Sequence, residues 1–231
     1  MKPPTGSSTT LVPATISDAR ATPTLKVSGL ACRRGNEWLF RGLDFAIYPG
    51  QMVWLRGHNG SGKTTLLRVV SGLTQADEGE LVWNPKPEET TAGVGKLVYI
   101  GHLNAMKDDL TVCESLQFVA RLHGRDGSEA AALSALRQLG MHHRRHAAVR
   151  TLSQGQRRRA ALARLALERS PLLWVLDEPY DALDTAGIQT VNALLVKHLE
   201  IGGSVLLTSH LALGADAPAT QELLLDKGIV A

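Results

Sequence analysis

The amino-acid sequence predicts an α/β protein with a mostly parallel core sheet. Short apolar runs typical of buried strands alternate with segments of helical periodicity, which is the pattern of β–α–β units. The chain has 231 residues, enough for one large domain or one domain with a small inserted lobe. Its composition, 44% hydrophobic and 20% charged, is that of a folded globular protein. Two cysteines are too few for a disulfide scaffold, and no apolar run approaches the roughly 20 residues of a membrane-spanning helix.

The expected elements follow in chain order. Residues 1–24 are rich in Ser, Thr, Pro and Ala, show no apolar signal segment and predict a disordered tail. Strands are expected over 25–30, 39–47, 51–56, 81–83, 97–100, 172–176 and 204–208. Helices are expected over 63–72, 112–122, 133–139, 156–169 and 185–200. The helical block at about 105–170 therefore indicates an insertion within an α/β domain that covers 25–231.

Charge is distributed unevenly along the chain. The net charge of +3 is too small to predict a nucleic-acid partner. Residues 121–169 nevertheless hold eleven arginines, no lysine and three acids, a local balance of +8. This block is either a solvated helix face or a surface that docks on an acidic patch or on anionic lipid.

A glycine-rich segment predicts a phosphate-binding loop. The pattern G-x-x-x-x-G-K-[ST] spans residues 57–64 and lies between an apolar run and a helix. The predicted nucleotide-binding residues are those of the pattern and the residue after it, namely Gly57, His58, Asn59, Gly60, Ser61, Gly62, Lys63, Thr64 and Thr65. Glycines let the backbone N–H groups curl around phosphate oxygens, and the helix N-terminus adds a favourable dipole. Lys63 is expected to reach the β and γ phosphates of ATP, and the Thr64 hydroxyl to ligate Mg²⁺.

Two acids complete this predicted site. Asp177 and Glu178 follow the apolar run 172–176, and open α/β sheets bind ligands at the carboxyl ends of such strands. Asp177 is expected to hold Mg²⁺ through water. Glu178 is placed to polarise the attacking water as a general base.

Further motifs carry a resemblance to a known family. Leu152-Ser153-Gln154-Gly155-Gln156 resembles the LSGGQ signature of ABC-transporter ATPases, with Gln in place of the first Gly, and an arginine-rich signature-like helix follows. Leu176–Pro179 resembles the family's Walker B motif, Ala182–Asp184 its D-loop and Thr208–His210 its switch histidine. These elements occur in the family's order between Leu25 and His210, so the chain is identified as similar to these P-loop NTPases.

The resemblance implies more than the residues alone. It implies an N-terminal antiparallel β subdomain beside the parallel sheet, and a head-to-tail homodimer that binds ATP and Mg²⁺. Each chain then offers its signature, Ser153, Gln154, Gly155 and Gln156, to the γ-phosphate held by its partner. His210 contacts the γ-phosphate in the same chain, and Asp184 belongs to the D-loop.

The sequence departs from the family at two places. Gly101-His102 stands where the family has a glutamine, so His102 is the equivalent of the Q-loop residue. The family also stacks adenine on an aromatic residue, but Arg33 and Arg34 lie at that position. An arginine plane could stack on the base, or Trp38 could swing in, and a weak base contact would reduce the preference for ATP over GTP.

Local details are similar to one branch, the ATP-binding subunits of the haem exporter of c-type cytochrome biogenesis. They are residues 30–43, Tyr99–His102 and Gln156–Leu165. This resemblance implies a peripheral subunit on the cytoplasmic side of the bacterial inner membrane, bound to separate integral membrane subunits. Its ATP hydrolysis would drive haem export or release of a haem-loaded chaperone. The alternative is the ATPase of an exporter for a lipid, peptide or drug.

Two other classes of ABC protein fit less well. A chromosome-structuring ATPase would need a long coiled coil, and the sequence has no sustained heptads. A ribosome-acting protein would need two ATPase domains, whereas one phosphate loop is present. RNA retention that depends on salt would favour that second class.

Overall fold

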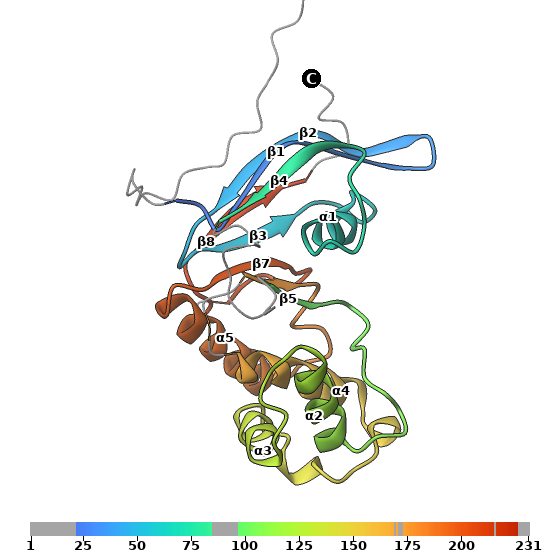
Figure 1. Ribbon diagram of the computed structural model, residues 1–231, viewed down its shortest axis with the longest axis vertical. Coiled ribbons are helices and arrows are strands. Elements are labelled where there is room, and N and C mark those ends of the chain that lie inside the picture. The colour runs from blue at the N-terminus through green and yellow to red at the C-terminus, as the bar shows by residue number, and fades with distance from the viewer. Residues whose placement is uncertain (1–21, 85–96, 169, 171–172, 215, 226–231) are drawn as a thin grey trace, which may run out of the picture.

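The computed structural model describes residues 22–84, 97–168, 170, 173–214 and 216–225. Residues 1–21 of the predicted tail lie outside this range, as do Arg169 and Leu172 at the ends of a predicted helix and strand. From top to bottom of Figure 1, an antiparallel sheet, a parallel sheet and a lobe of helices are stacked along the long axis.

The antiparallel sheet has the strand order β2-β1-β4. Its strands are β1 (Leu25–Arg34), β2 (Glu37–Ile47) and β4 (Glu78–Trp83). β1 and β2 form a hairpin in which Leu25 pairs with Ile47 and Arg34 with Glu37, with register shifts between them. The sheet packs its apolar side inward, because Leu25, Val27, Phe40 and Phe45 are buried. This is the β subdomain that the family resemblance implied.

The parallel sheet has the strand order β5-β6-β7-β3-β8, and its strands pair in parallel throughout. They are β3 (Met52–Arg56), β5 (Leu97–Ile100), β6 (Leu173–Leu176), β7 (Ser204–Thr208) and β8 (Thr220–Leu224). The three central strands are buried on both faces, which explains why they are continuously apolar in sequence. The predicted mostly parallel core sheet is confirmed.

Alternate side chains of these strands pack into two separate hydrophobic cores, one on each face of the parallel sheet. Val53, Val175 and Leu206 pack with helix α1 (Lys63–Val70) and with the antiparallel sheet. Their neighbours Trp174 and Val205 point to the other core, which contains helix α5 (Thr185–Glu200) and the helical lobe. Helix α1 thus lies between the two sheets, and α5 covers the opposite face of the parallel sheet (Figure 1).

The helical lobe contains α2 (Val112–Leu122), α3 (Glu129–Gln138) and α4 (Gln154–Leu162). Short 3₁₀ turns connect and extend them at η2 (His142–Arg144), η3 (Val149–Thr151) and η4 (Ala163–Leu167). Capping boxes start α2 at Thr111 and α4 at Ser153, so each first turn satisfies its own backbone donors. The domain boundaries drawn from the sequence at 25 and at about 105 and 170 remain predictions.

The structure shifts the bounds of several predicted helices and adds one strand. Helix α3 begins at Glu129, four residues before its predicted start, and α1 ends at Val70, two residues before its predicted end. The α-helix expected over 156–169 begins two residues earlier and ends at Leu162, because the chain tightens into the 3₁₀ turns of η4. Strand β8 was not predicted. The strand is short and its sequence is not continuously apolar, because it lies at the edge of the sheet. There its exposed Glu222 pairs with Arg56 at 2.9 Å.

Candidate functional site

A cleft of about 700 Å³ opens where strands β3, β6 and β7 end. It brings together ten of the residues predicted from sequence, namely Asn59, Gly60, Gly62, Lys63, Thr64, Thr65, His102, Asp177, Glu178 and His210. Its lining includes four basic side chains, those of Arg33, Arg34, Lys63 and Arg68. A cleft of this size with four cations around three acids suits a polyphosphate ligand.

The glycine-rich loop forms the floor of the cleft. A side chain on Gly57 would clash with the Leu225 carbonyl and the Ser61 hydroxyl, so only glycine lets the loop pass this point. Gly62 adopts φ +100° and caps α1 without contributing a side-chain bond. The Lys63 ammonium lies inside the loop, donating to the carbonyls of Gly57 at 2.8 Å and His58 at 3.0 Å. The loop therefore holds a cation directly before an open helix N-terminus.

The two acids at the end of β6 are held by a buried hydroxyl. Thr208 at the end of β7 donates to Asp177 Oδ1 at 2.8 Å and accepts from the Glu178 backbone N–H at 3.0 Å. The Glu178 carboxylate accepts from the His210 backbone N–H at 2.8 Å, and the His210 ring nitrogen lies 3.3 Å from it. The sequence analysis named Thr208 only as part of the switch-histidine motif, and its contacts with the two acids appear only when β6 and β7 pair.

Glu178 has the environment of a general base. Burial raises the pKa of its carboxyl, while the bond from His210 opposes that rise. A raised pKa makes the carboxylate a stronger proton acceptor near neutral pH. Its backbone adopts φ +50°, a conformation that non-glycine residues rarely take and that is concentrated at functional sites.

The donor set also fits Mg²⁺. Asp177 is 3% exposed, and its Oδ2 atom has no hydrogen-bond partner among the described residues. Thr64 lines the same cleft with its hydroxyl-bearing side chain. A carboxylate and a hydroxyl suit a hard cation that completes its shell with phosphate oxygens and water. Among the described residues, no group of three or more His, Cys, Asp or Glu side chains is placed to hold a metal ion by itself, so this is not an all-protein metal cage.

His102 reaches the cleft from the loop after β5. Its Nδ1 atom lies 3.5 Å from Asp181 Oδ2, and its side chain is 66% exposed. Most of its side chain is therefore accessible at the cleft, and its predicted role as the Q-loop equivalent stays a prediction. Asp181 also lines the cleft and was missed, because its contact with His102 spans distant parts of the sequence.

Arg33 and Arg34, at the position where the family has its adenine-stacking residue, also line the cleft. The Asp77 carboxylate binds Arg33 through both of its oxygens. Oδ2 accepts from the Arg33 backbone N–H at 2.8 Å, and Oδ1 accepts from the Arg33 Nε and Nη2 groups at 3.1 and 3.0 Å. The guanidinium groups of Arg33 and Arg41 each lie 4.8 Å from the centroid of the Trp38 ring. The indole is thus engaged by two cations, while Arg33 itself lines the cleft. Between the two options for a base contact, the geometry favours the arginine plane.

The signature residues lie outside the cleft lining. Ser153 Oγ accepts from the Gln156 backbone N–H, and Gln156 Oε1 accepts from the Ser153 N–H, both at 3.3 Å. Gly155 packs so closely on the Ala182 carbonyl that no side chain fits there. Asp184 pairs with Arg159 and caps α5 through the Gly187 N–H. Signature and D-loop are therefore in contact with each other, apart from the phosphate loop.

Known proteins place this arrangement in a family. The family model described as ABC transporter matches residues 40–181. The chain belongs to the ABC transporter family. It is 42% identical over 203 residues to the cytochrome c biogenesis ATP-binding export protein CcmA of Nitrosospira multiformis, covering 87% of this chain and 98% of that one. CcmA of Albidiferax ferrireducens is 44% identical, with 83% and 91% covered.

A solved structure agrees with the sequence matches. A putative ABC transporter ATP-binding protein from Pyrococcus furiosus superposes with a TM-score of 0.72 at 26% identity, covering 87% of this chain and 96% of that one. The predicted ABC-type ATPase fold and the resemblance to the cytochrome c biogenesis branch are confirmed. Among the helices that the structure describes, none is both long and apolar enough to cross a bilayer.

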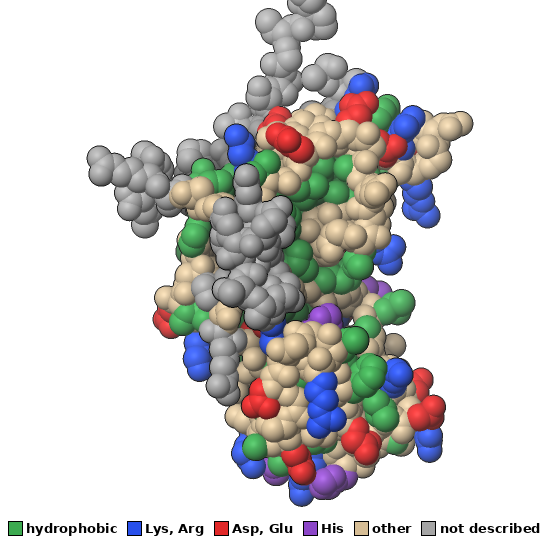
Figure 2. All heavy atoms as spheres, viewed as in Figure 1, with side chains coloured by type: hydrophobic (Ala, Val, Ile, Leu, Met, Phe, Trp, Pro, Cys, Tyr) green, Lys and Arg blue, Asp and Glu red, His purple; other side chains and the backbone are tan. Residues whose placement is uncertain are grey.

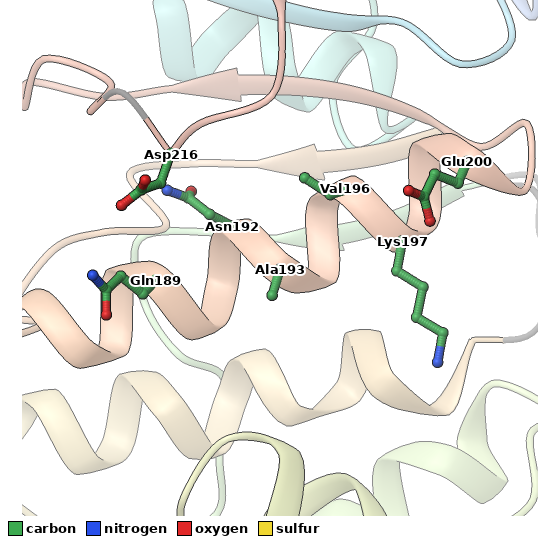
Figure 3. A pocket seen from close by; sticks show the side chains of 7 residues that line it. All are labelled: Gln189, Asn192, Ala193, Val196, Lys197, Glu200 and Asp216. Atoms are coloured by element: carbon green, nitrogen blue, oxygen red, sulfur yellow. The ribbon is translucent and has the colours of Figure 1, made fainter.

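A second groove in this ABC ATPase runs along α5 and has a volume of about 690 Å³. It is lined by Gln189, Asn192, Ala193, Val196, Lys197, Glu200 and Asp216, and Figure 3 shows Asp216 beside Asn192 above the helix. None of these is a sequence-predicted site residue. The chemistry of the molecule is therefore concentrated in the first cleft.

The arginine-rich block of the ABC ATPase is largely engaged within the fold. Arg125 pairs with Glu168 at 2.6 Å, and three further ion pairs join the block to acids outside it, namely Arg150–Asp109, Arg157–Asp108 and Arg159–Asp184. Basic and acidic side chains are interspersed over the viewed face of the lobe (Figure 2). This pattern favours the interpretation as a solvated helix face over that of a uniformly basic docking surface.

Proposed function

We propose that the chain is the ATP-binding and hydrolysing subunit of a bacterial exporter that serves c-type cytochrome biogenesis, coupling ATP hydrolysis to haem export or to release of a haem-loaded chaperone. The observation that carries the proposal is the assembly of Lys63, Asp177 and Glu178 in one cationic cleft. The branch is supported by export-protein relatives that this chain matches along most of its length.

The hydrolytic step follows from the geometry of the cleft. The loop and Lys63 hold the β and γ phosphates, and Thr64 and Asp177 would hold Mg²⁺, which would neutralise phosphate charge when bound. Glu178 accepts a proton from the attacking water, and His210 orients the Glu178 carboxylate from the neighbouring strand end. Because Glu178 is buried, its carboxylate is shielded from bulk water, which strengthens its interaction with the reacting groups.

A second copy of this chain completes the site. The start of α4 offers a helix N-terminus for anion binding, but Ser153 and Gly155 are not part of the lining of their own chain's cleft. A head-to-tail homodimer brings each α4 start to the partner's γ-phosphate. Asp184, next to the signature, then lies at the dimer interface.

Separate integral membrane subunits are the other proposed partners. The chain would bind them peripherally on the cytoplasmic side of the inner membrane. His102 and its loop, exposed at the mouth of the cleft, are placed to relay the state of the nucleotide to such a partner.

Replacement of the chromosomal gene tests the substrate. A strain carrying Glu178→Gln should make c-type apocytochromes without covalently bound haem, measured by haem staining of membrane proteins after gel electrophoresis. The same tagged variant should copurify from detergent-extracted membranes with multi-spanning subunits. Normal haem attachment, with a defect in export of a lipid, peptide or drug instead, would identify the alternative exporter class.

A further inference from the structure

Arg158 is the buried arginine of the signature helix α4, with 3% exposure, and the proposed reaction gives it no role. Its guanidinium reaches across from α4 to the ends of β5 and β6. The five N–H groups of an arginine meet five acceptors here: Asp177 O at 2.6 Å, Glu178 O at 2.8 Å, Gly101 O at 2.9 Å, Asn104 Oδ1 at 3.0 Å and Pro179 O at 3.4 Å. The whole donor capacity of the group is used.

These acceptors belong to the segments that carry the hydrolytic residues. Asp177, Glu178 and Pro179 are consecutive, and the left-handed backbone at Glu178 lies in the middle of the turn that presents their carbonyls to one cation. Gly101 directly precedes His102. One planar cation therefore ties the turn that orients Glu178 to the loop that carries the Q-loop equivalent.

Stability alone does not explain a charge at this position. Removing a guanidinium from water is costly, and a well-packed apolar side chain at such a place is often as stabilising. No carboxylate oxygen is among its five acceptors, which are four backbone carbonyls and one amide. What the arginine provides, and an apolar residue cannot, is a fixed geometry for four carbonyl groups.

Arg158 also joins the two halves of the site. It lies on the second turn of α4, five residues after Ser153, at which that helix is capped. The start of the same helix packs on the D-loop, through Gly155 against Ala182 and Arg159 against Asp184. Arg158 therefore connects the signature helix directly to the turn that holds Glu178.

We propose that Arg158 is a positioning residue for ATP hydrolysis, which fixes the 177–179 turn and the Gly101 carbonyl so that the Glu178 carboxylate is aimed at the attacking water when the signature helix engages its partner. The proposal rests on the assignment of Glu178 as general base. It assigns Arg158 no contact with nucleotide.

Arg158→Lys and Arg158→Gln test the proposal by separating catalysis from stability. The ammonium of lysine has three N–H donors and the amide of glutamine two, so neither can bind five acceptors. We expect kcat to fall about 10- to 100-fold, because small misplacements of catalytic groups have costs of this size. The KM for ATP should change less than about threefold, since the phosphate loop is untouched. Arg158→Gln leaves at least three buried acceptors without a donor, so its melting temperature should fall as well, and kcat is compared per folded molecule.

Arg125→Lys is the matched control. Arg125 is a nearly buried arginine of the same lobe, but it pairs with Glu168 and touches neither the 177–179 turn nor Gly101. This variant should lower the melting temperature and keep the wild-type kcat per folded molecule. Wild-type kcat in a folded Arg158→Gln protein, or an equal loss of kcat in Arg125→Lys, would overturn the proposal.

Single-turnover hydrolysis of radiolabelled ATP in a double-mutant cycle tests the route of the effect. If Arg158 acts through Glu178, adding Arg158→Lys to Glu178→Gln should reduce the residual rate by less than about twofold. A further loss as large as in the wild-type background would show that Arg158 acts elsewhere, contradicting the proposal. Failure of Glu178 as the base would appear separately, as normal turnover in the single Glu178→Gln variant.

Discussion

The two halves of the catalytic site are built in different ways. The phosphate loop, Asp177 and Glu178 lie at the ends of strands that are buried on both faces, so the core of the domain fixes their relative positions. The signature lies at the exposed start of α4, where Ser153 and Gln156 satisfy each other in a capping box. The first half lies within one chain, whereas we propose that the second acts on the nucleotide of a partner chain. Binding and hydrolysis should therefore respond to different substitutions.

Glu178→Gln should have the largest effect and separates the two processes. We expect turnover to fall by about 10²- to 10⁴-fold, the usual contribution of a general base, with ATP binding retained. Gel filtration with ATP should then show a trapped dimer, measured against the nucleotide-free protein. Normal hydrolysis in this variant would show that the base lies elsewhere.

Gly155→Asp alters the signature half of the site and should abolish turnover of ATP. A side chain at this position meets the Ala182 carbonyl, so the start of α4 and the D-loop must separate, and the new carboxylate repels phosphate. Equilibrium binding of ATP to the single chain should stay within about twofold of wild type. Equal loss of binding and turnover would contradict a signature that acts on the partner's nucleotide.

Lys63→Ala should weaken binding itself. Loss of a charged hydrogen-bond donor to phosphate corresponds to about 10- to 100-fold in affinity. Isothermal titration with ATP measures this, with Lys26→Ala on the exposed side of β1 as a charge-matched control. Unchanged affinity would remove the main support for the phosphate-loop assignment.

Arg33→Ala should have the smallest effect on nucleotide affinity. It tests whether the base contact within the binding half distinguishes ATP from GTP. A stacked guanidinium is worth about 0.5–1 kcal/mol at an exposed site, or a two- to fivefold loss of affinity. Because stacking reads no base edge, ATP and GTP should lose affinity equally, measured by competition titration. Arg41→Ala, which removes the other cation over Trp38, is the control and should leave both affinities unchanged. A selective loss for ATP would indicate a base-specific contact instead.

The binding half was predictable from sequence because its residues are local. The phosphate loop is one continuous segment, and Asp177 and Glu178 directly follow a run whose apolar character reports burial on both faces. Their meeting at one sheet edge follows from parallel topology. The signature, the D-loop and the role of a second chain came from the family resemblance, since nothing in the local pattern of residues 152–156 requires more than a capped helix.

The connections within the site were not predictable in the same way. Arg158 joins positions 19 to 57 residues away, and its neighbours Arg157 and Arg159 have the same residue type but bind Asp108 and Asp184 instead. Periodicity could not distinguish the three. Asp77 and Thr208 are likewise ordinary residues whose partners, Arg33 and Asp177, appear only after the sheets assemble.

The layer of Arg33 and Arg41 over Trp38 gives the protein an optical probe of its own. Indole emission responds to charges at van der Waals distance, and one of these two guanidinium groups lines the nucleotide cleft while the other is paired with Glu78. Occupation of the cleft that shifts Arg33 changes the field on the ring. The chain has four tryptophans, so a variant that keeps only Trp38 would let fluorescence follow nucleotide loading of the isolated subunit without any attached label.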